Sequence, residues 1–223
     1  VGQADEQVEI KIVKDIIKDI DHKVEVDSTK NIKLDLNGFT FTTSADDYVI
    51  TNYGTLEIYD SSETEDEETG ETIAGTGKLT ATTKGGILNS VSGENRGNLT
   101  ITSGTYEYTK SVSSYSNQTA IYNTGDLYVN GGTIKVTQNY NTAIHNANGG
   151  YVEFAGGGID SYYDGIRNDS GATLLATGGS VRTNNNACVR NSGTFTTRGN
   201  PDFNSYNGYS DDGALINLGT ANI

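Results

Sequence analysis

Hydrophobic residues recur at every second position over short stretches of the chain, and Gly, Asn, Ser and Thr separate these stretches. Pairs of apolar residues two apart, such as Leu99/Ile101 and Leu127/Val129, are followed, after a glycine-rich corner, by a third apolar residue seven positions beyond the first of the pair. A period of two is typical of β-strands that bury one face. The pattern therefore predicts an all-β fold of many short strands.

The alternating stretches belong to an internal repeat. TAIYNTGDLYVNGGTIKV begins at residue 119, and TAIHNANGGYVEFAGGGIDS and DGIRNDSGATLLATGGSVRT follow it. Each copy carries one Asn at the same place, and these residues are Asn52, Asn89, Asn123, Asn146, Asn168, Asn191 and Asn217. Their separations are 37, 34, 23, 22, 23 and 26 residues. The repeat predicts a single-stranded right-handed parallel β-helix of about seven coils of 22–23 residues, with insertions at 60–77 and roughly 90–97.

Two positions before the repeated Asn lies an aliphatic residue that we expect to point inward, as Ile121 does before Asn123. A buried amide at a turn can bond both the local backbone and the equivalent amide of the next coil. We therefore interpret the seven Asn residues as a structural ladder and not as a binding site.

The two ends of the repeat differ. We expect one β-helix domain over 1–223, in which 1–36 supply an N-terminal cap and the first strands and 37–223 supply the repeated coils. Apolar residues with helical spacing predict a short capping helix over the first coil; they are Val13, Ile16, Ile17 and Ile20. The last segment, ALINLGTANI, begins a coil and stops, so we expect further domains of the same protein after Ile223.

The insertion at 60–77 is strongly acidic. Its carboxylates are Asp60, Glu63, Glu65, Asp66, Glu67, Glu68 and Glu71. Clustered carboxylates can bind Ca²⁺, but the order of Asp, Asn and Gly that typifies calcium loops is missing. We expect a solvated, mobile loop, no metal site and no cofactor, and the alternative interpretation is a Ca²⁺-binding loop.

Charge and hydropathy exclude two classes of partner. A formal net charge of −14 argues against nucleic acid, since phosphate binding needs clustered Lys and Arg. No apolar run approaches the roughly 20 residues that span a bilayer, so we expect no membrane insertion.

The single cysteine, Cys188, cannot form an internal disulfide.

Three segments carry a resemblance to a known family. LDLNGFTF (34–41), VITNYGTLEIYDSS (49–62) and AIYNTGDLYVNGGTI (120–134) resemble the pectate-lyase-like right-handed parallel β-helix regions of Gram-positive bacterial surface proteins. The resemblance covers the chain from about residue 24 onward. It implies an extracellular, secreted or cell-wall-attached protein, adhesin-like or carbohydrate-binding.

One line of side chains is a candidate ligand-binding surface. The residue before each ladder Asn should point outward, and four adjacent coils there present Tyr122, His145, Arg167 and Arg190. Asp164 and Tyr163 lie just upstream on the same side. A tyrosine stacks on a sugar ring and an arginine binds a carboxylate, so the stripe suits an acidic polysaccharide. The alternative interpretation is an ordinary solvent face that carries two arginines.

Exposed tyrosines provide a second candidate recognition surface. Tyrosine gives a large contact area at low entropic cost, although it also stabilises sheets. The residues in question are Tyr106, Tyr108, Tyr115, Tyr128, Tyr140, Tyr151, Tyr162, Tyr163, Tyr206 and Tyr209.

These features predict a non-catalytic module that presents a glycan-binding or host-surface-binding face or acts as a structural stalk. The first alternative is a polysaccharide lyase or glycoside hydrolase of the pectin-lyase-like fold. Two-carboxylate hydrolysis needs its groups about 5–10 Å apart, whereas Asp164 is two coils away from Asp211 and Asp212. The second alternative is a phage tailspike-like receptor-binding segment.

Overall fold

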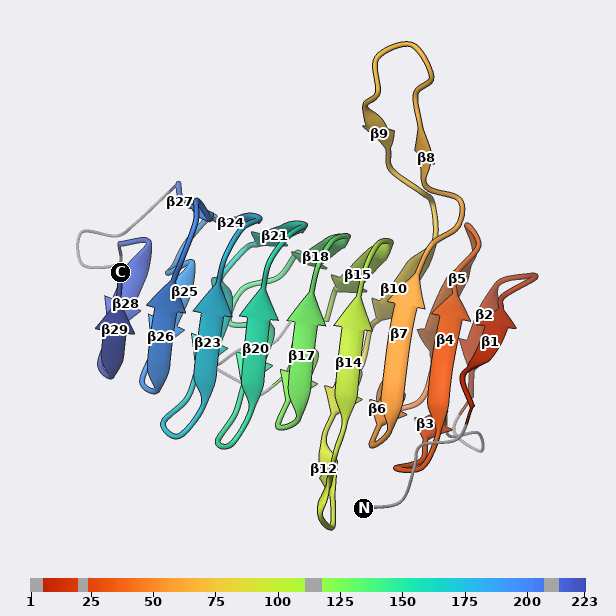
Figure 1. Ribbon diagram of the computed structural model, residues 1–223, viewed down its shortest axis with the longest axis horizontal. Coiled ribbons are helices and arrows are strands. Elements are labelled where there is room, and N and C mark those ends of the chain that lie inside the picture. The colour runs from red at the N-terminus through yellow and green to blue at the C-terminus, as the bar shows by residue number, and fades with distance from the viewer. Residues whose placement is uncertain (1–5, 20–23, 111–117, 207–212) are drawn as a thin grey trace.

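The computed structural model is an all-β parallel solenoid of about eight turns with no helix in the residues that it describes, which are 6–19, 24–110, 118–206 and 213–223 (Figure 1). Each turn adds one strand to each of three parallel sheets, and the strands of a sheet stack along the long axis of the molecule. The predicted parallel β-helix is therefore confirmed.

The first sheet, sheet A, has nine strands. In order along the stack they are β1 (Val8–Lys11), β4 (Asn31–Asp35), β7 (Thr55–Tyr59), β14 (Asn98–Ile101), β17 (Asp126–Val129), β20 (Tyr151–Phe154), β23 (Thr173–Ala176), β26 (Thr194–Thr197) and β29 (Thr220–Asn222).

Sheet B has eight strands and follows a glycine-rich corner in most turns. They are β2 (Ile16–Lys18), β5 (Thr40–Thr43), β10 (Lys78–Ala81), β15 (Thr105–Tyr108), β18 (Thr133–Val136), β21 (Gly158–Ser161), β24 (Ser180–Thr183) and β27 (Asp202–Ser205).

Sheet C also has eight strands, and its strands from β6 onward end at a ladder Asn. They are β3 (Glu25–Val26), β6 (Tyr48–Asn52), β11 (Gly85–Asn89), β16 (Thr119–Asn123), β19 (Thr142–Asn146), β22 (Asp164–Asn168), β25 (Val189–Asn191) and β28 (Leu215–Asn217).

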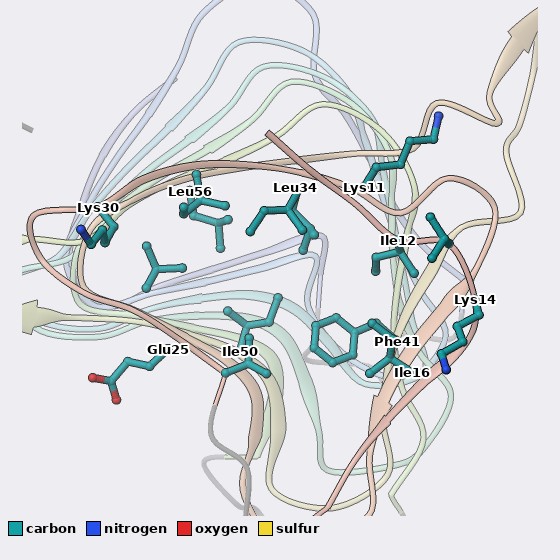
Figure 2. Close-up of a pocket in the computed structure, with 15 residues that line it drawn as sticks. Lys11, Ile12, Lys14, Ile16, Glu25, Lys30, Leu34, Phe41, Ile50 and Leu56 are labelled. Atoms are coloured by element: carbon teal, nitrogen blue, oxygen red, sulfur yellow. The ribbon is translucent and has the colours of Figure 1, made fainter. Parts of the chain in front are cut away.

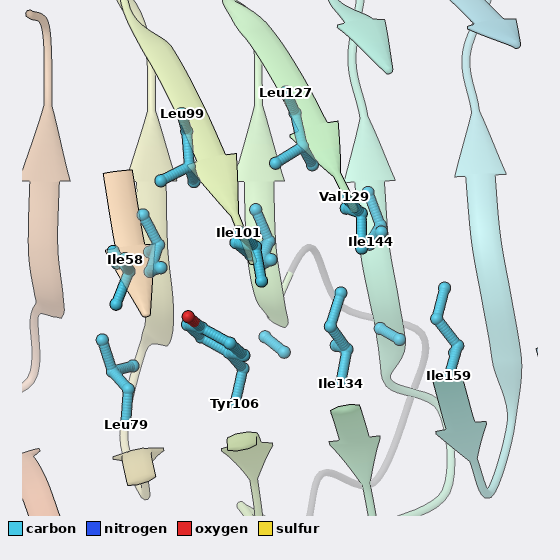
Figure 3. Close-up of a cluster of buried hydrophobic side chains, with 14 of the residues drawn as sticks. Ile58, Leu79, Leu99, Ile101, Tyr106, Leu127, Val129, Ile134, Ile144 and Ile159 are labelled. Atoms are coloured by element: carbon cyan, nitrogen blue, oxygen red, sulfur yellow. The ribbon is translucent and has the colours of Figure 1, made fainter. Parts of the chain in front are cut away.

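The core consists of columns of equivalent side chains from successive turns. In sheet A the partners at one position are Leu56, Leu99, Leu127, Val152, Leu174 and Phe195, and none of them is more than 1% exposed. Figure 3 shows such side chains converging from different sheets on the interior of the coil. Burying an aliphatic side chain of this size contributes about 1.5–3 kcal/mol, so the columns are the main source of stability.

The count of coils is higher than predicted because the first turn lacks the repeated amide. Val26 occupies the ladder position there, in register with Asn52 of the next turn. Counting Asn residues therefore misses one turn. The insertions raise the average length to about 25 residues per turn.

The predicted capping helix is wrong. Ile16, Ile17 and Lys18 form strand β2, which pairs in parallel with β5. Val13 is 74% exposed and Ile17 is 71% exposed, so the helical spacing of apolar residues does not mark a buried face. Ile20 lies outside the described residues.

Both insertions form two-stranded antiparallel hairpins. The first contains β8 (Thr64–Glu65) and β9 (Thr72–Ile73) and stands away from the solenoid in Figure 1. The second contains β12 (Val91–Ser92) and β13 (Asn95–Arg96).

Asp60 differs from the other carboxylates of the acidic insertion, because it is only 2% exposed. Its carboxylate accepts hydrogen bonds from the backbone N–H groups of Gly38 at 2.8 Å and Gly77 at 2.7 Å. Asp60 therefore anchors the base of the first hairpin to the solenoid and is not part of the solvated segment.

Two of the tyrosines predicted to be exposed belong to the core. Tyr106 is 1% exposed and Tyr108 is fully buried, because both are inward-pointing positions of strand β15. Their hydroxyls donate to the backbone carbonyls of Ser103 and Thr83, at 3.0 Å and 2.8 Å. Tyr115 and Tyr209 lie outside the described residues.

Candidate functional site

The seven ladder residues form one continuous hydrogen-bonded column along the end of sheet C. In each step an Asn Nδ2 donates to the Oδ1 of the Asn in the next turn, at 2.6–2.8 Å. Asn146 Nδ2, for example, donates to Asn168 Oδ1 at 2.8 Å and to the carbonyl of Thr173 at 2.9 Å. The first six amides are buried and committed to one another, so this column serves the fold.

The candidate stripe lies beside this column, with its residues in register on four neighbouring strands. Tyr122 pairs with His145, His145 with Arg167, and Arg167 with Arg190. The stripe does not form one uniform surface, because its members differ in what they contact. Tyr122 and His145 pack together edge to face, with ring centroids 4.9 Å apart.

His145 is almost completely covered although it points away from the core, since only 4% of it is exposed. Its Nε2 lies 2.8 Å from Asp169 Oδ2. Burial lowers the pKa of His145 below its ordinary value of 6.5, and Asp169 opposes this without cancelling it. The neutral ring therefore donates its Nε2–H to the carboxylate, which can only accept.

Each arginine of the stripe is held by one carboxylate. Arg167 Nε donates to Asp169 Oδ1 at 2.8 Å. Arg190 Nε donates to Asp164 Oδ2 at 3.2 Å, and its Nη2 donates to Asn186 Oδ1 at 3.0 Å. The two arginine side chains remain 30% and 28% exposed, so both guanidinium groups are oriented and still partly open to solvent.

The arginines line a shallow depression of about 450 Å³, which we call the arginine depression. Its other lining residues are Tyr163, Asp169 and Ser192. Three predicted residues thus meet here, since Tyr163 joins Arg167 and Arg190. Asp164 lies fully buried beneath Arg190, and Tyr122 and His145 do not line the depression.

Asp169 is the site residue that the sequence interpretation missed. It links His145 to Arg167 through its two oxygens. The signal was present in the sequence: the residues after the ladder Asn are Tyr53, Ser90, Thr124, Ala147, Asp169, Ser192 and Leu218, and Asp169 is the one charged residue among them. A stripe drawn only from the residues before each Asn could not include it.

The two carboxylates beside the arginines are engaged in ion pairs. Burial raises the pKa of Asp169, but hydrogen bonds from His145 and Arg167 lower it by more than burial raises it. The pKa therefore lies below its ordinary value of 3.8. Asp169 therefore stays ionised at neutral pH and cannot act as a general acid. Asp164 is buried behind an arginine, and Asp211 and Asp212 lie outside the described residues.

Within the described residues, no group of three or more His, Cys, Asp or Glu side chains is placed to hold a metal ion. Glu65, Glu67 and Glu68 are exposed to solvent along the hairpin.

A hollow of about 440 Å³ opens at the N-terminal end of the solenoid. Figure 2 shows Leu34, Leu56, Ile50 and Phe41 pointing into it, whereas Lys30 points outward. The same four hydrophobic residues belong to the core. The hollow is therefore the open end of the hydrophobic core and not a polar recognition site.

The fold defines the class of this protein as a parallel β-solenoid. Comparisons with protein-family models, with curated proteins and with solved structures found no match. The described residues contain no helix capable of spanning a membrane.

Proposed function

We propose that this solenoid is a non-catalytic, glycan-binding module of an extracellular bacterial surface protein, adhesin-like in role and either secreted or attached to the cell wall. The observation that carries the proposal is the arginine depression, where Tyr163, Arg167 and Arg190 converge on one open hollow. An aromatic ring beside oriented donors is suited to a sugar, because the ring packs on the apolar face and the guanidinium groups bond hydroxyl or carboxylate oxygens.

The ion pairs change the expected ligand. Asp164 and Asp169 balance the charges of Arg190 and Arg167, and His145 is neutral at physiological pH because burial lowers its pKa. The depression therefore has no net positive charge, and the whole chain carries −14. This balance favours an uncharged or weakly acidic glycan of a bacterial or host surface over the strongly acidic polysaccharide that the two arginines alone indicate.

The test is binding to an array of neutral and acidic oligosaccharides, followed by titration of the strongest hit. Tyr163→Ala and Arg167→Gln are expected to weaken binding at least tenfold, because each removes a group that lines the depression. Arg198→Gln is the matched control, since Arg198 is exposed and does not line the depression. Equal affinity in all four proteins would overturn the proposal.

The same samples test the alternatives. Release of unsaturated uronates from pectin with Ca²⁺ would establish a lyase, and release of reducing sugars would establish a hydrolase. A trimer in solution would support the tailspike-like interpretation. If no glycan binds, no product is released and no trimer forms, the remaining interpretation is a structural stalk.

A further inference from the structure

A second polar groove, of about 520 Å³, lies on sheet B, a different sheet from the one that carries Arg167 and Arg190. Strands β18, β21 and β24 line it, and Tyr206 lies beside its far strand. We call it the Gly158 groove. Its size is within the range of small-ligand sites, and none of its lining residues belongs to the arginine depression.

Gly158 interrupts a column that otherwise carries side chains. The equivalent residues of the other turns are Thr40, Lys78, Thr105, Thr133, Ser180 and Asp202. Glycine in a strand is less stable than alanine by about 0.5–1 kcal/mol. A glycine here therefore needs a reason.

The backbone does not supply that reason. Gly158 lacks the positive φ that favours glycine, and a Cβ built on it would meet only Ser180 Oγ, at 3.7 Å, which is ordinary van der Waals contact. Its neighbour Gly157 differs on both counts, because it has a φ of 76° and its Cβ would lie 2.5 Å from the carbonyl oxygen of Gly132. The fold requires a glycine at 157 but not at 158, where the missing side chain leaves space in the groove.

Two opposite charges stand side by side in the groove. Asp160 and Arg182 are in register on adjacent strands, and both are exposed. Within the described part of the chain neither side chain makes a hydrogen bond or an ion pair. Their hydrogen-bonding capacity is therefore available to a ligand, unlike that of Arg167, whose Nε is bonded to Asp169.

The remaining wall is aromatic and polar. Tyr206 follows strand β27 and is 61% exposed, and the amide of Asn184 is exposed beside it in the lining. An exposed ring next to a carboxylate and a guanidinium group presents an apolar face, an acceptor and several donors over a short distance.

We propose that the Gly158 groove binds a neutral saccharide. A sugar unit lies over Gly158, where no side chain obstructs it, with neighbouring hydroxyls donating to Asp160 and accepting from Arg182, and with Tyr206 against the ring. The two charges cancel and the chain as a whole is anionic, so an uncharged ligand is favoured over a polyanion. This site is separate from the one in the proposed function, and either can exist without the other.

Filling the groove tests the proposal with little risk to the fold. In Gly158→Val a β-branched side chain occupies the groove at a position that accepts a Cβ, so the melting temperature is expected to be unchanged or higher. Affinity for the strongest neutral hit from an array of hexose, pentose and N-acetylhexosamine oligosaccharides is expected to fall at least tenfold. Thr105→Val is the matched control, since it places the same valine side chain in the same column two turns away, outside the groove.

A double variant and its control protect the test against misfolding. The double variant Asp160→Asn/Arg182→Gln keeps the shape of the groove and is also expected to lose at least tenfold in affinity. The control, Tyr163→Ala, is expected to keep the affinity of the wild type. Unchanged affinity in Gly158→Val and in the Asp160/Arg182 variant would overturn the proposal. So would a neutral hit whose binding is abolished by Tyr163→Ala, and that result would leave the proposed function standing. A wild-type chain that binds no neutral saccharide overturns it as well.

Discussion

His145 Nε2 and Asp169 Oδ2 lie 2.8 Å apart across two neighbouring turns of the solenoid. The other oxygen of Asp169 accepts from Arg167, so one carboxylate orients both an imidazole and a guanidinium group. The contact joins a covered histidine, which does not line the arginine depression, to a carboxylate that does.

Mild acid is expected to destabilise the folded chain through His145. Burial lowers its pKa in the fold below the ordinary 6.5. The unfolded chain therefore takes up a proton at a pH where the folded chain does not, and the free energy of unfolding decreases as the pH falls from about 6.5 toward the folded pKa. Urea unfolding of the wild type and of His145→Gln between pH 7.5 and about 5 measures this. A slope that persists unchanged in the variant would contradict the assignment.

A second loss of stability is expected in stronger acid. Hydrogen bonds hold the pKa of Asp169 below 3.8, although burial acts against them. A carboxylate with a lowered pKa stabilises the fold above its unfolded value, and this contribution disappears as the pH falls through the folded pKa. Asp169→Asn should show a smaller decrease below pH 4 than the wild type in the same unfolding series.

An Asn in the middle of the ladder is expected to contribute far more to the free energy of unfolding than the Asn at its end. Asn146→Ala removes four hydrogen bonds, to Asn123, Asn168 and the carbonyls of Gly150 and Thr173, and breaks the column between Asn123 and Asn168. The expected loss is about 3 kcal/mol. Asn217→Ala is the control, because that amide is exposed at the last described turn, and its cost should stay below about 1 kcal/mol. Similar losses in both variants would refute the ladder as a cooperative column.

Tyr106 is expected to act as a core residue with one essential polar atom. Tyr106→Phe keeps the packing of the ring but leaves the carbonyl of Ser103 without its hydrogen bond, so a loss of about 1–2 kcal/mol is expected from denaturant unfolding. The matched control is Tyr128→Phe, because Tyr128 lies on the outer face of sheet A in contact with the ring of Tyr151. That change should cost less than about 0.5 kcal/mol.

The stability lost when Arg190 is replaced is expected to depend on the buried charge of Asp164. Arg190→Met leaves a fully buried carboxylate without its guanidinium partner, which should cost about 3 kcal/mol. Adding Asp164→Asn removes the buried charge, so the double variant should recover at least half of that loss. If the two single variants and the double variant were simply additive, the ion pair would not be the source of the effect.

The hydrophobic pattern and the spacing of Asn were sufficient to predict the coils, the ladder and the inward columns. Those features are local: alternation determines which face of a strand is buried, and the recurrence of the same motif after each ladder Asn places Leu99 over Leu127, independently of the surface side chains. The same reasoning failed at residues 13–20, where apolar residues have helical spacing but the chain pairs as β2. A strand at the end of the solenoid obtains its hydrogen bonds from the neighbouring turn. The spacing of apolar residues within the strand does not predict that pairing.

Only the tertiary structure decided what the surface residues do. The sequence placed four residues in one line: Tyr122, His145, Arg167 and Arg190. The fold covers His145 and pairs each arginine with a carboxylate. It also adds Asp169, the residue directly after a ladder Asn, which bonds His145. The core pattern depends on the period of two alone, whereas side-chain pairing depends on which turn lies next in the stack and how far each side chain reaches. That is why the sequence by itself determined the solenoid, and why the charge balance of the arginine depression and the open space over Gly158 appeared only once the turns were stacked.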